Sequence, residues 1–500
     1  MAQNGTRAAI VEAGSAVPTL DRRLLLLTTY LLYIVVNTVS SSLMPSIQTD
    51  IGFSLGTVAR ISSAQTLAQM FGKICWGGWP VSAFGGTRTY VGTMLILGAF
   101  VASYTLSPSA AVLGTFVFCA EFFSTSTFPC HVQIIRGHWS ESARPDGFWL
   151  LGVASRSGDV LSKLGWGALA SLLPWEVVCS VAVGVSGVAA ALALVWHRDS
   201  STVRFARPQQ LLTPATTVRI VRKFLSLRMF WVAAAALSCT TMVKRTNELL
   251  LPIYFRDIGF EAGIVDDARA SRLSAAWSAG VAVSVFVGGH FFAKAAAVPG
   301  RQSNLMAALL AVSTASFALL ALLPGSVSTE GSLWLRVCLV FTGGTGIGAA
   351  YYIPAGVFST KYGGDNAGVL SSYLDATSFL SSALFIQFLG MVAERVSWSS
   401  ALWLLALAGA GSWILTPYFI RQLTMDTPDG TDLARAAAPT TVGSQAEYEK
   451  IIPESESDTE PAPSSEAATT EGHKDRRRGR TRRNYEAGEG ENQGLLQQEV

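Results

Sequence analysis

Twelve long apolar runs divide the first 420 residues of this 500-residue chain, and they constrain its fold more than any other feature. A helix needs about 20 apolar residues to cross the hydrocarbon layer of a bilayer. Backbone groups in lipid must pair within their own segment, so we expect each run to be a helix. The predicted spans, six and then six, are residues 24–45, 58–81, 90–106, 110–134, 147–173 and 177–196, then 230–255, 275–292, 304–323, 333–357, 368–392 and 401–420.

The composition agrees with an all-α membrane protein and excludes several other classes. Half of the residues are apolar, 14% are charged, and the mean hydropathy is +0.37, which is unusual for a soluble globular protein. The last 80 residues hold sixteen acidic and ten basic residues, a composition that cannot bury a core, so we expect residues 421–500 to be disordered. A fused enzyme has no segment in which to fold, and no basic face suits a nucleic acid.

Basic residues in the short loops predict the topology. Most of them fall on one side of the predicted spans, and the linker at residues 197–229 alone holds seven. By the positive-inside rule we place residues 1–23, the linker and the tail in the cytosol, around bundles at residues 24–196 and 230–420. The basic residues of that side outside the linker are Arg22, Arg23, Arg88, Arg144, Lys294, Arg301 and Lys361.

Charged residues inside the spans are the main candidates for a functional site, because lipid makes them costly unless they face an interior. The fifth span carries Arg156, Asp159 and Lys163 on one helical face. These three could form a salt-bridged structural triad. Alternatively, two cations and one anion leave a surplus positive charge that would attract an anionic solute.

The seventh span repeats this pattern with Lys244, Arg245 and Glu248. Lys244 and Glu248 are four residues apart and can pair, whereas Arg245 points about 100° away, so we expect one of the two cations to be free. Polar stripes also follow the second and eleventh spans, and together these four spans predict one central polar cavity. The stripes comprise Ser62, Gln65, Gln69 and Lys73, and then Ser371, Asp375, Ser378 and Ser382.

Two further groups of side chains lie in the spans. Glu121 follows Phe116 and Phe118 and precedes Phe122 and Phe123, so we expect a poorly solvated carboxyl that could carry a coupling proton. The six cysteines lie in spans without metal-type spacing. We therefore predict no disulfide, no metal site, no cofactor and no enzymatic activity.

Several short motifs resemble those of the major facilitator superfamily, and within it the organophosphate:phosphate antiporters, which include the glycerol-3-phosphate and glucose-6-phosphate carriers. The similar segments are residues 71–77 (FGKICWG), 128–130 (FPC) leading to Trp139 and Arg144, 151–158 with 165–167 (GWG), 244–254, 362–364 (YGG) and 373–375 (YLD). The resemblance implies two six-helix pseudo-repeats, a midplane site and alternating access.

The sequence departs from that family where the phosphate would bind. The family's first-helix arginine falls at Asn37, and its seventh-helix arginine falls at Lys244, next to Arg245. The position of its fifth-helix histidine lies near Arg156, so a cation could have moved there from the first helix. Gly72 and Lys73 match the family pattern.

We therefore predict a secondary transporter of a small organic anion, with organophosphates as one case and phosphate or a proton as the coupling ion. The predicted binding residues are Arg156, Lys244, Arg245, Lys73, Asn37 and Lys163, and the predicted charge network is Asp159, Glu121, Glu248 and Asp375. Two alternatives stay open, which are a proton-coupled carrier of a neutral solute such as a sugar, and a nutrient receptor on a transporter scaffold.

A short motif in the C-terminal tail predicts which cellular membranes contain the protein. Glu491, Leu495 and Leu496 form an acidic dileucine pattern similar to the sorting signals that adaptors read in eukaryotic membrane proteins. We therefore expect a multi-pass protein of a eukaryotic plasma membrane or endomembrane, with both termini in the cytosol.

Overall fold

The computed structural model describes residues 20–107, 109–139, 144–199, 221–260, 263–295, 298, 300–363 and 367–425. All regular elements in these ranges are helices, as the apolar runs predict. The predicted dileucine signal and nearly all of the tail lie outside the described residues.

The first half of the chain supplies six spans. The second, third, fifth and sixth are α4 (Leu55–Cys75), α6 (Gly86–Tyr104), α9 (Arg144–Ala170) and α10 (Trp175–Asp199), and α5 (Trp79–Phe84) is a short connecting helix. The first span consists of α2 (Leu20–Asn37) and α3 (Val39–Ile51), and the fourth of α7 (Ala110–Ser124) and α8 (Thr127–His138).

The second half supplies six more spans. They are α12 (Arg228–Phe260), α13 (Asp267–Val283) continued by η3 (Ser284–Gly288) and α14 (Gly289–Ala295), α15 (Arg301–Leu322), α16 (Glu330–Gly363), α17 (Ala367–Arg395) and α18 (Trp398–Met425). Eight of the described helical segments are long and apolar enough to cross a membrane by length and composition alone. Three of the remaining spans, α4, α9 and α12, carry most of the interior charges.

Four predicted spans are interrupted where we expected continuous helices, and one of them, residues 58–81, ends with α4 at Cys75 and resumes in α5 at Trp79. The hydroxyl of Thr38 binds the carbonyl oxygens of Ile34 and Val35 at the break between α2 and α3. Thr125 and Ser126 make the same kind of bond between α7 and α8. In the eighth span a π-helical turn forms around Ser284, whose hydroxyl accepts the backbone N–H of Ala349 at 2.9 Å. Side-chain hydroxyls that compete for backbone groups favour such local departures from the α-helix.

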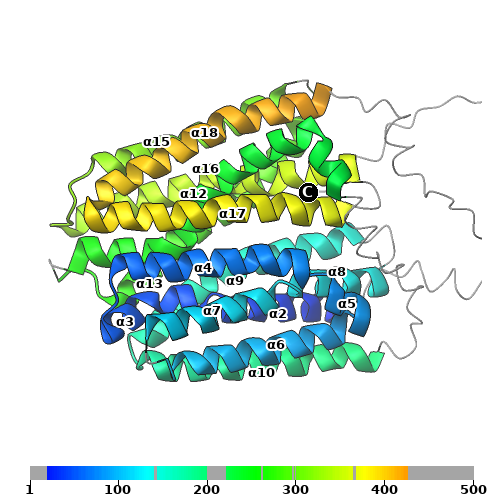
Figure 1. Ribbon diagram of the computed structural model, residues 1–500, viewed down its shortest axis with the longest axis horizontal. Coiled ribbons are helices and arrows are strands. Elements are labelled where there is room, and N and C mark those ends of the chain that lie inside the picture. The colour runs from blue at the N-terminus through cyan, green and yellow to red at the C-terminus, as the bar shows by residue number, and fades with distance from the viewer. Residues whose placement is uncertain are drawn as a thin grey trace, which may run out of the picture. The chain divides into compact units, whose positions relative to one another are not determined.

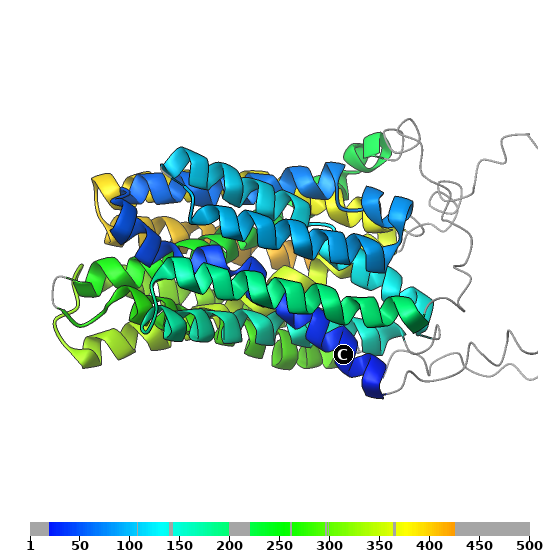
Figure 2. The same cartoon turned by 90° about the horizontal axis from the view of Figure 1, so that it is seen from below.

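The two halves pack against each other mainly along two helix pairs, α4 with α17 and α9 with α13, and α3 also contacts α12 and α13. Figure 1 shows α17 alongside α4, and Figure 2 shows the whole helical bundle turned by 90°. The N-terminal part of α4 approaches the C-terminal part of α17 closely, because Ala59 faces Gly390 and the Ser63 hydroxyl donates to the Ala383 carbonyl at 2.9 Å. Small residues of this kind let two helix backbones come together in a membrane.

A hydrogen bond between a tryptophan and an aspartate is repeated in the two halves of the chain. In each half it joins the start of the last span to the end of the first. Trp175 at the start of α10 donates its indole N–H to Asp50 at the end of α3 over 3.0 Å. Trp398 at the start of α18 donates to Asp257 near the end of α12 over 3.1 Å. In both halves the aspartate follows a helical proline by five residues, at Pro45 and at Pro252. The two six-helix bundles therefore carry the same contact at equivalent positions.

Candidate functional site

The charged residues predicted as site residues come together in the interior from both halves. The first half contributes α2, α4, α7 and α9, and the second contributes α12, α16 and α17. Each side chain lies within a long helix, so its backbone groups are paired and only the side chain needs a partner. The partners come from neighbouring helices and from the preceding or following turn of the same helix.

Glu248 lies between the two cations of α12. Its carboxylate is 2.6 Å from the amine of Lys244 and 3.0 Å from the guanidinium of Arg245. The pairing of Lys244 with Glu248 is confirmed. The expectation that one of the two cations is free is wrong, because Arg245 is three residues before Glu248 and its long side chain reaches the same carboxylate.

Arg245 also links the two halves. Its guanidinium lies 3.7 Å from the carboxylate of Glu121 on α7, which is an ion pair but too long for a hydrogen bond. The amide of Gln69 on α4 donates a hydrogen bond to the same carboxylate, and Asn37 and Gln65 also face it. Only 2% of Glu121 is exposed. The carboxyl is therefore poorly solvated, as the sequence predicts, and amide side chains of neighbouring helices supply its hydrogen bonds.

Arg156 of α9 differs from the other predicted site cations, which lie between the two halves and all have a carboxylate partner. Its guanidinium lies over the ring of Tyr352 at 4.8 Å and donates to the hydroxyl of the adjacent Ser155 at 2.7 Å. No carboxylate lies within ion-pair distance of it among the described residues, and its buried Nη1 atom has no hydrogen-bond partner. An unsatisfied buried donor is costly, and for a charged group the cost is larger.

Asp159 and Lys163 lie on the same face of α9 as Arg156, about one and two turns closer to the C-terminal end of the helix. Their charged groups are 4.0 Å apart, and the amine of Lys163 also donates to Ser278 of α13 at 2.9 Å. Lys163 is 1% exposed at this contact between the two halves. The structure therefore pairs two members of the predicted triad and leaves Arg156 out of the pair.

Lys73 and Asp375 form an ion pair between α4 and α17. The amine of Lys73 also lies 5.1 Å from the ring of Phe379, and Arg245 lies over the same ring at 5.8 Å. These contacts join the polar stripes of the second and eleventh spans, and they give Lys73, which the sequence analysis named as a solute-binding residue, a carboxylate partner. The pair connects the two halves through charge, whereas Ala59 and Gly390 connect them through close packing.

Aromatic side chains of α16 complete the site, and the sequence analysis missed them. Tyr351 and Tyr352 pack edge to face with ring centres 4.6 Å apart, and the amine of Lys244 lies 4.6 Å from the first and 5.6 Å from the second. Tyr352 thus contacts both Lys244 of the second half and Arg156 of the first. The two adjacent tyrosines within an apolar span were a signal that could have indicated them.

Arg336 of α16 was also missed, and it has a structural role. It is 1% exposed, and its guanidinium donates to the Tyr254 hydroxyl at 2.9 Å and to the carbonyl oxygens of Pro324 and Ser326. These bonds attach the segment before α16 to α12. A buried arginine with several oxygen partners can be tolerated inside a helical bundle.

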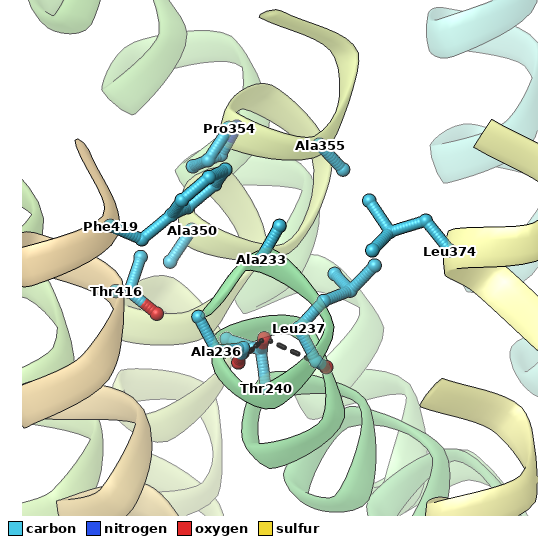
Figure 3. A pocket seen from close by; sticks show the side chains of 10 residues that line it. All are labelled: Ala233, Ala236, Leu237, Thr240, Ala350, Pro354, Ala355, Leu374, Thr416 and Phe419. Atoms are coloured by element: carbon cyan, nitrogen blue, oxygen red, sulfur yellow. Dashed lines mark hydrogen bonds between the residues drawn. The ribbon is translucent and has the colours of Figure 1, made fainter. Parts of the chain in front are cut away.

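A small pocket within the second half lies apart from this cluster (Figure 3). No charged side chain lines it, and the hydroxyl of Thr240 is already bonded to the carbonyl oxygens of Ala236 and Leu237. Such a pocket offers nothing to an ionic solute. The residues that line it are Ala233, Ala236, Leu237, Thr240, Ala350, Pro354, Ala355, Leu374, Thr416 and Phe419.

Within the described residues, no group of three or more histidine, cysteine or acidic side chains could hold a metal ion. All six cysteines lie in this part of the chain and are free thiols. The interior cluster is therefore built from charged, amide and aromatic side chains. These groups can bind a small polar or ionic molecule through hydrogen bonds, ion pairs and ring contacts.

Comparisons with known proteins identify the architecture. The family described as Major Facilitator Superfamily matches residues 26–386. A variant of the nucleoside transporter NupG is similar in structure, with a TM-score of 0.63, 13% identity, and coverage of 80% of this chain and 98% of that one. A bacterial homologue of the human lysosomal transporter Spinster, in an inward-facing and unoccupied conformation, has a TM-score of 0.59, 15% identity, and coverage of 80% and 97%. A search of the curated proteins found no match.

Proposed function

Because this chain belongs to the major facilitator superfamily, and is thus a multi-pass membrane transporter of small solutes, we propose that its solute is an organic anion held by Arg156. The anion moves by alternating access, in which two bundles rock around a site between them. Arg156 belongs to the first bundle and Lys244 to the second. An anion that contacts both cations would favour the state in which the bundles close around it.

The observation that carries this proposal is that no carboxylate of the described residues lies within ion-pair distance of Arg156, whereas every other cation of the cluster has one within 4.0 Å. The buried Nη1 of Arg156 also has no hydrogen-bond partner among these residues. A guanidinium can bind a carboxylate or a phosphate through two parallel hydrogen bonds. The ring of Tyr352, which faces both Arg156 and Lys244, supports a common binding space for the two cations.

Uptake by reconstituted vesicles tests the proposal. The purified protein should transport at least one member of a panel of organic anions with saturable kinetics, and Arg156→Gln should abolish that uptake while the protein stays folded. Arg156→Lys should weaken it, because lysine keeps the charge but loses the two-pronged geometry. Arg60→Gln is the matched control, because Arg60 is exposed and bonds only to Thr57 among the described residues. Full anion uptake by Arg156→Gln would contradict the proposal.

A second candidate function is the proton-coupled transport of a neutral solute. The amides of Gln69, Gln65 and Asn37 around Glu121 favour it, because amides bind neutral hydroxyl or base groups. In this case Glu121 takes the proton, and the charged pairs act as structural contacts. Uptake of sugars or nucleosides that is driven by a pH gradient, lost in Glu121→Gln and retained in Arg156→Gln would favour this second function.

The placement in the cell remains part of the proposal. We infer cytosolic termini and a cytosolic linker from the basic loops, and adaptor binding from Glu491, Leu495 and Leu496. Surface labelling of cells that express Leu495→Ala/Leu496→Ala, beside the unmodified chain, tests the sorting signal. Identical distributions of the two proteins would contradict it.

A further inference from the structure

The interior cluster has an unequal number of positive and negative groups. We propose that the transported anion carries a single negative charge, as a carboxylate does, and not the two charges of a phosphate monoester. This inference rests on the proposed function and narrows its substrate class. It also departs from the organophosphates that the sequence resemblance suggests.

The charge balance follows from the pairs already described. With all its carboxyl groups ionised, the cluster holds five cations and four carboxylates among the described residues, and each carboxylate is in contact with at least one cation. Lys73 pairs with Asp375, Lys163 with Asp159, Lys244 and Arg245 with Glu248, and Arg245 also with Glu121. Only the charge of Arg156 is left over.

A buried net charge is unfavourable, because the interior cannot solvate it as water does. An anion with one charge brings the cluster to neutrality when it binds at Arg156. A dianion would leave one uncompensated negative charge close to Asp159 and Glu248, the acidic groups that interact with Arg156. The site therefore favours the monoanion through the sum of its charges, and the planar guanidinium favours a flat carboxylate.

Aromatic side chains near Arg156 indicate that the uncharged part of the anion would meet aromatic rings. Tyr30 of α2 and Tyr352 of α16 are both close enough to Arg156 to interact with it electrostatically. Each has a second tyrosine beside it, with ring centres 5.6 Å apart for Tyr30 and Tyr33 and 4.6 Å apart for Tyr351 and Tyr352. Probes that carry a ring are therefore the appropriate choice for a test.

The first experiment compares head groups on matched skeletons. Phenylacetate, phenyl phosphate and phenylacetamide share a ring and carry one, about two and no negative charges at pH 7.5. Glycerate with glycerol 3-phosphate, and glucuronate with glucose 6-phosphate, provide pairs without an aromatic ring. Binding is measured by thermal stabilisation of the purified full-length chain and by competition in vesicle uptake.

We expect the carboxylate to bind better than its phosphate partner by at least about tenfold, which corresponds to about 1.4 kcal/mol. Equal or tighter binding of the phosphates would overturn the inference, and so would the failure of every carboxylate to bind. If phosphates bind tightly and Arg156→Gln abolishes that binding, the single-charge inference fails and the proposed function stands. If only phenylacetamide binds, both fail.

The second experiment changes the charge balance without touching Arg156. Asp375→Asn removes one carboxylate and frees Lys73, so the cluster then has two surplus positive charges. We expect the preference between carboxylate and phosphate to shift toward phosphate by about tenfold. The double variant Lys73→Gln/Asp375→Asn restores one surplus charge and should restore the carboxylate preference.

Glu248→Gln provides an independent version of this change close to Arg156 and covers the case in which Asp375→Asn does not fold. It should shift the preference in the same direction. An unchanged preference in folded Asp375→Asn or Glu248→Gln would overturn the inference. A preference that follows the charge balance in both single variants and returns in the double variant would support it.

Discussion

Trp398 donates its indole N–H to the carboxylate of Asp257 across 3.1 Å, and this bond ties the start of α18 to the end of α12. The equivalent bond from Trp175 to Asp50, at 3.0 Å, ties α10 to α3 in the first half. Both aspartates follow a helical proline by five residues. The first and last spans of each bundle are thus joined at the same end by the same kind of bond.

Removal of these indole bonds should lower stability without changing what the protein binds. Trp398→Phe and Trp175→Phe each keep the ring and lose one hydrogen bond to a charged group, which corresponds to about 1.5–3 kcal/mol. We expect a lower midpoint of thermal unfolding for both, with unchanged solute affinity. Trp413→Phe is the control, because Trp413 is exposed on the outer surface of α18. Midpoints equal to that of the control would show that the bonds do not stabilise the bundles.

A larger side chain at position 390 should disrupt the close packing between α4 and α17. A side chain there would collide with the Cβ atom of Ala59, so Gly390→Val must push the two helices apart. We expect slower transport with little change in thermal stability, because the collision lies between the halves and not within a bundle. Gly184→Val on α10 is the matched control, since a side chain there meets no other atom. Transport by Gly390→Val at the rate of the control would contradict this prediction.

Replacement of Glu248 should lower the stability of the protein, whereas replacement of Arg156 should abolish anion uptake. Glu248→Ala leaves Lys244 with no carboxylate partner among the described residues, and the loss of one member of a buried pair typically costs about 3–5 kcal/mol. Arg156→Ala removes a cation that has no ion pair, so we expect little loss of stability but a complete loss of anion uptake. Thermal unfolding and uptake are measured on both variants. A large stability loss in Arg156→Ala would instead indicate a structural role.

The linker between the bundles should lie on the cytosolic side. Its seven basic residues stand against one acidic residue, Asp199, which is the bias that keeps a loop from crossing the membrane. An epitope inserted next to Gln210 should therefore be accessible to antibody only after cells are permeabilised. Labelling of intact cells would show that the topology is inverted.

The sequence by itself determined that this chain is a bundle of membrane helices. Long apolar runs specify helices because lipid leaves the backbone no other partner, and this argument needs no contacts between spans. Spacing also predicted the pair of Lys244 and Glu248, since residues four apart meet on one helix. The breaks in the first, fourth and eighth spans were missed, because they depend on where hydroxyls such as those of Thr38 and Ser284 find partners.

Only the tertiary structure decided which cation of the cluster has no carboxylate partner among the described residues. Arg245 meets Glu121 across 124 positions of sequence, and Lys163 meets Ser278 across 115. No periodicity along one helix encodes such contacts, because they depend on how separate helices rotate and pack. The sequence could therefore name the five cations and four carboxylates of the cluster. Which of these residues pair with each other depends on the positions of helices from both halves. In the described residues that arrangement leaves Arg156 without a carboxylate and places it beside Tyr352.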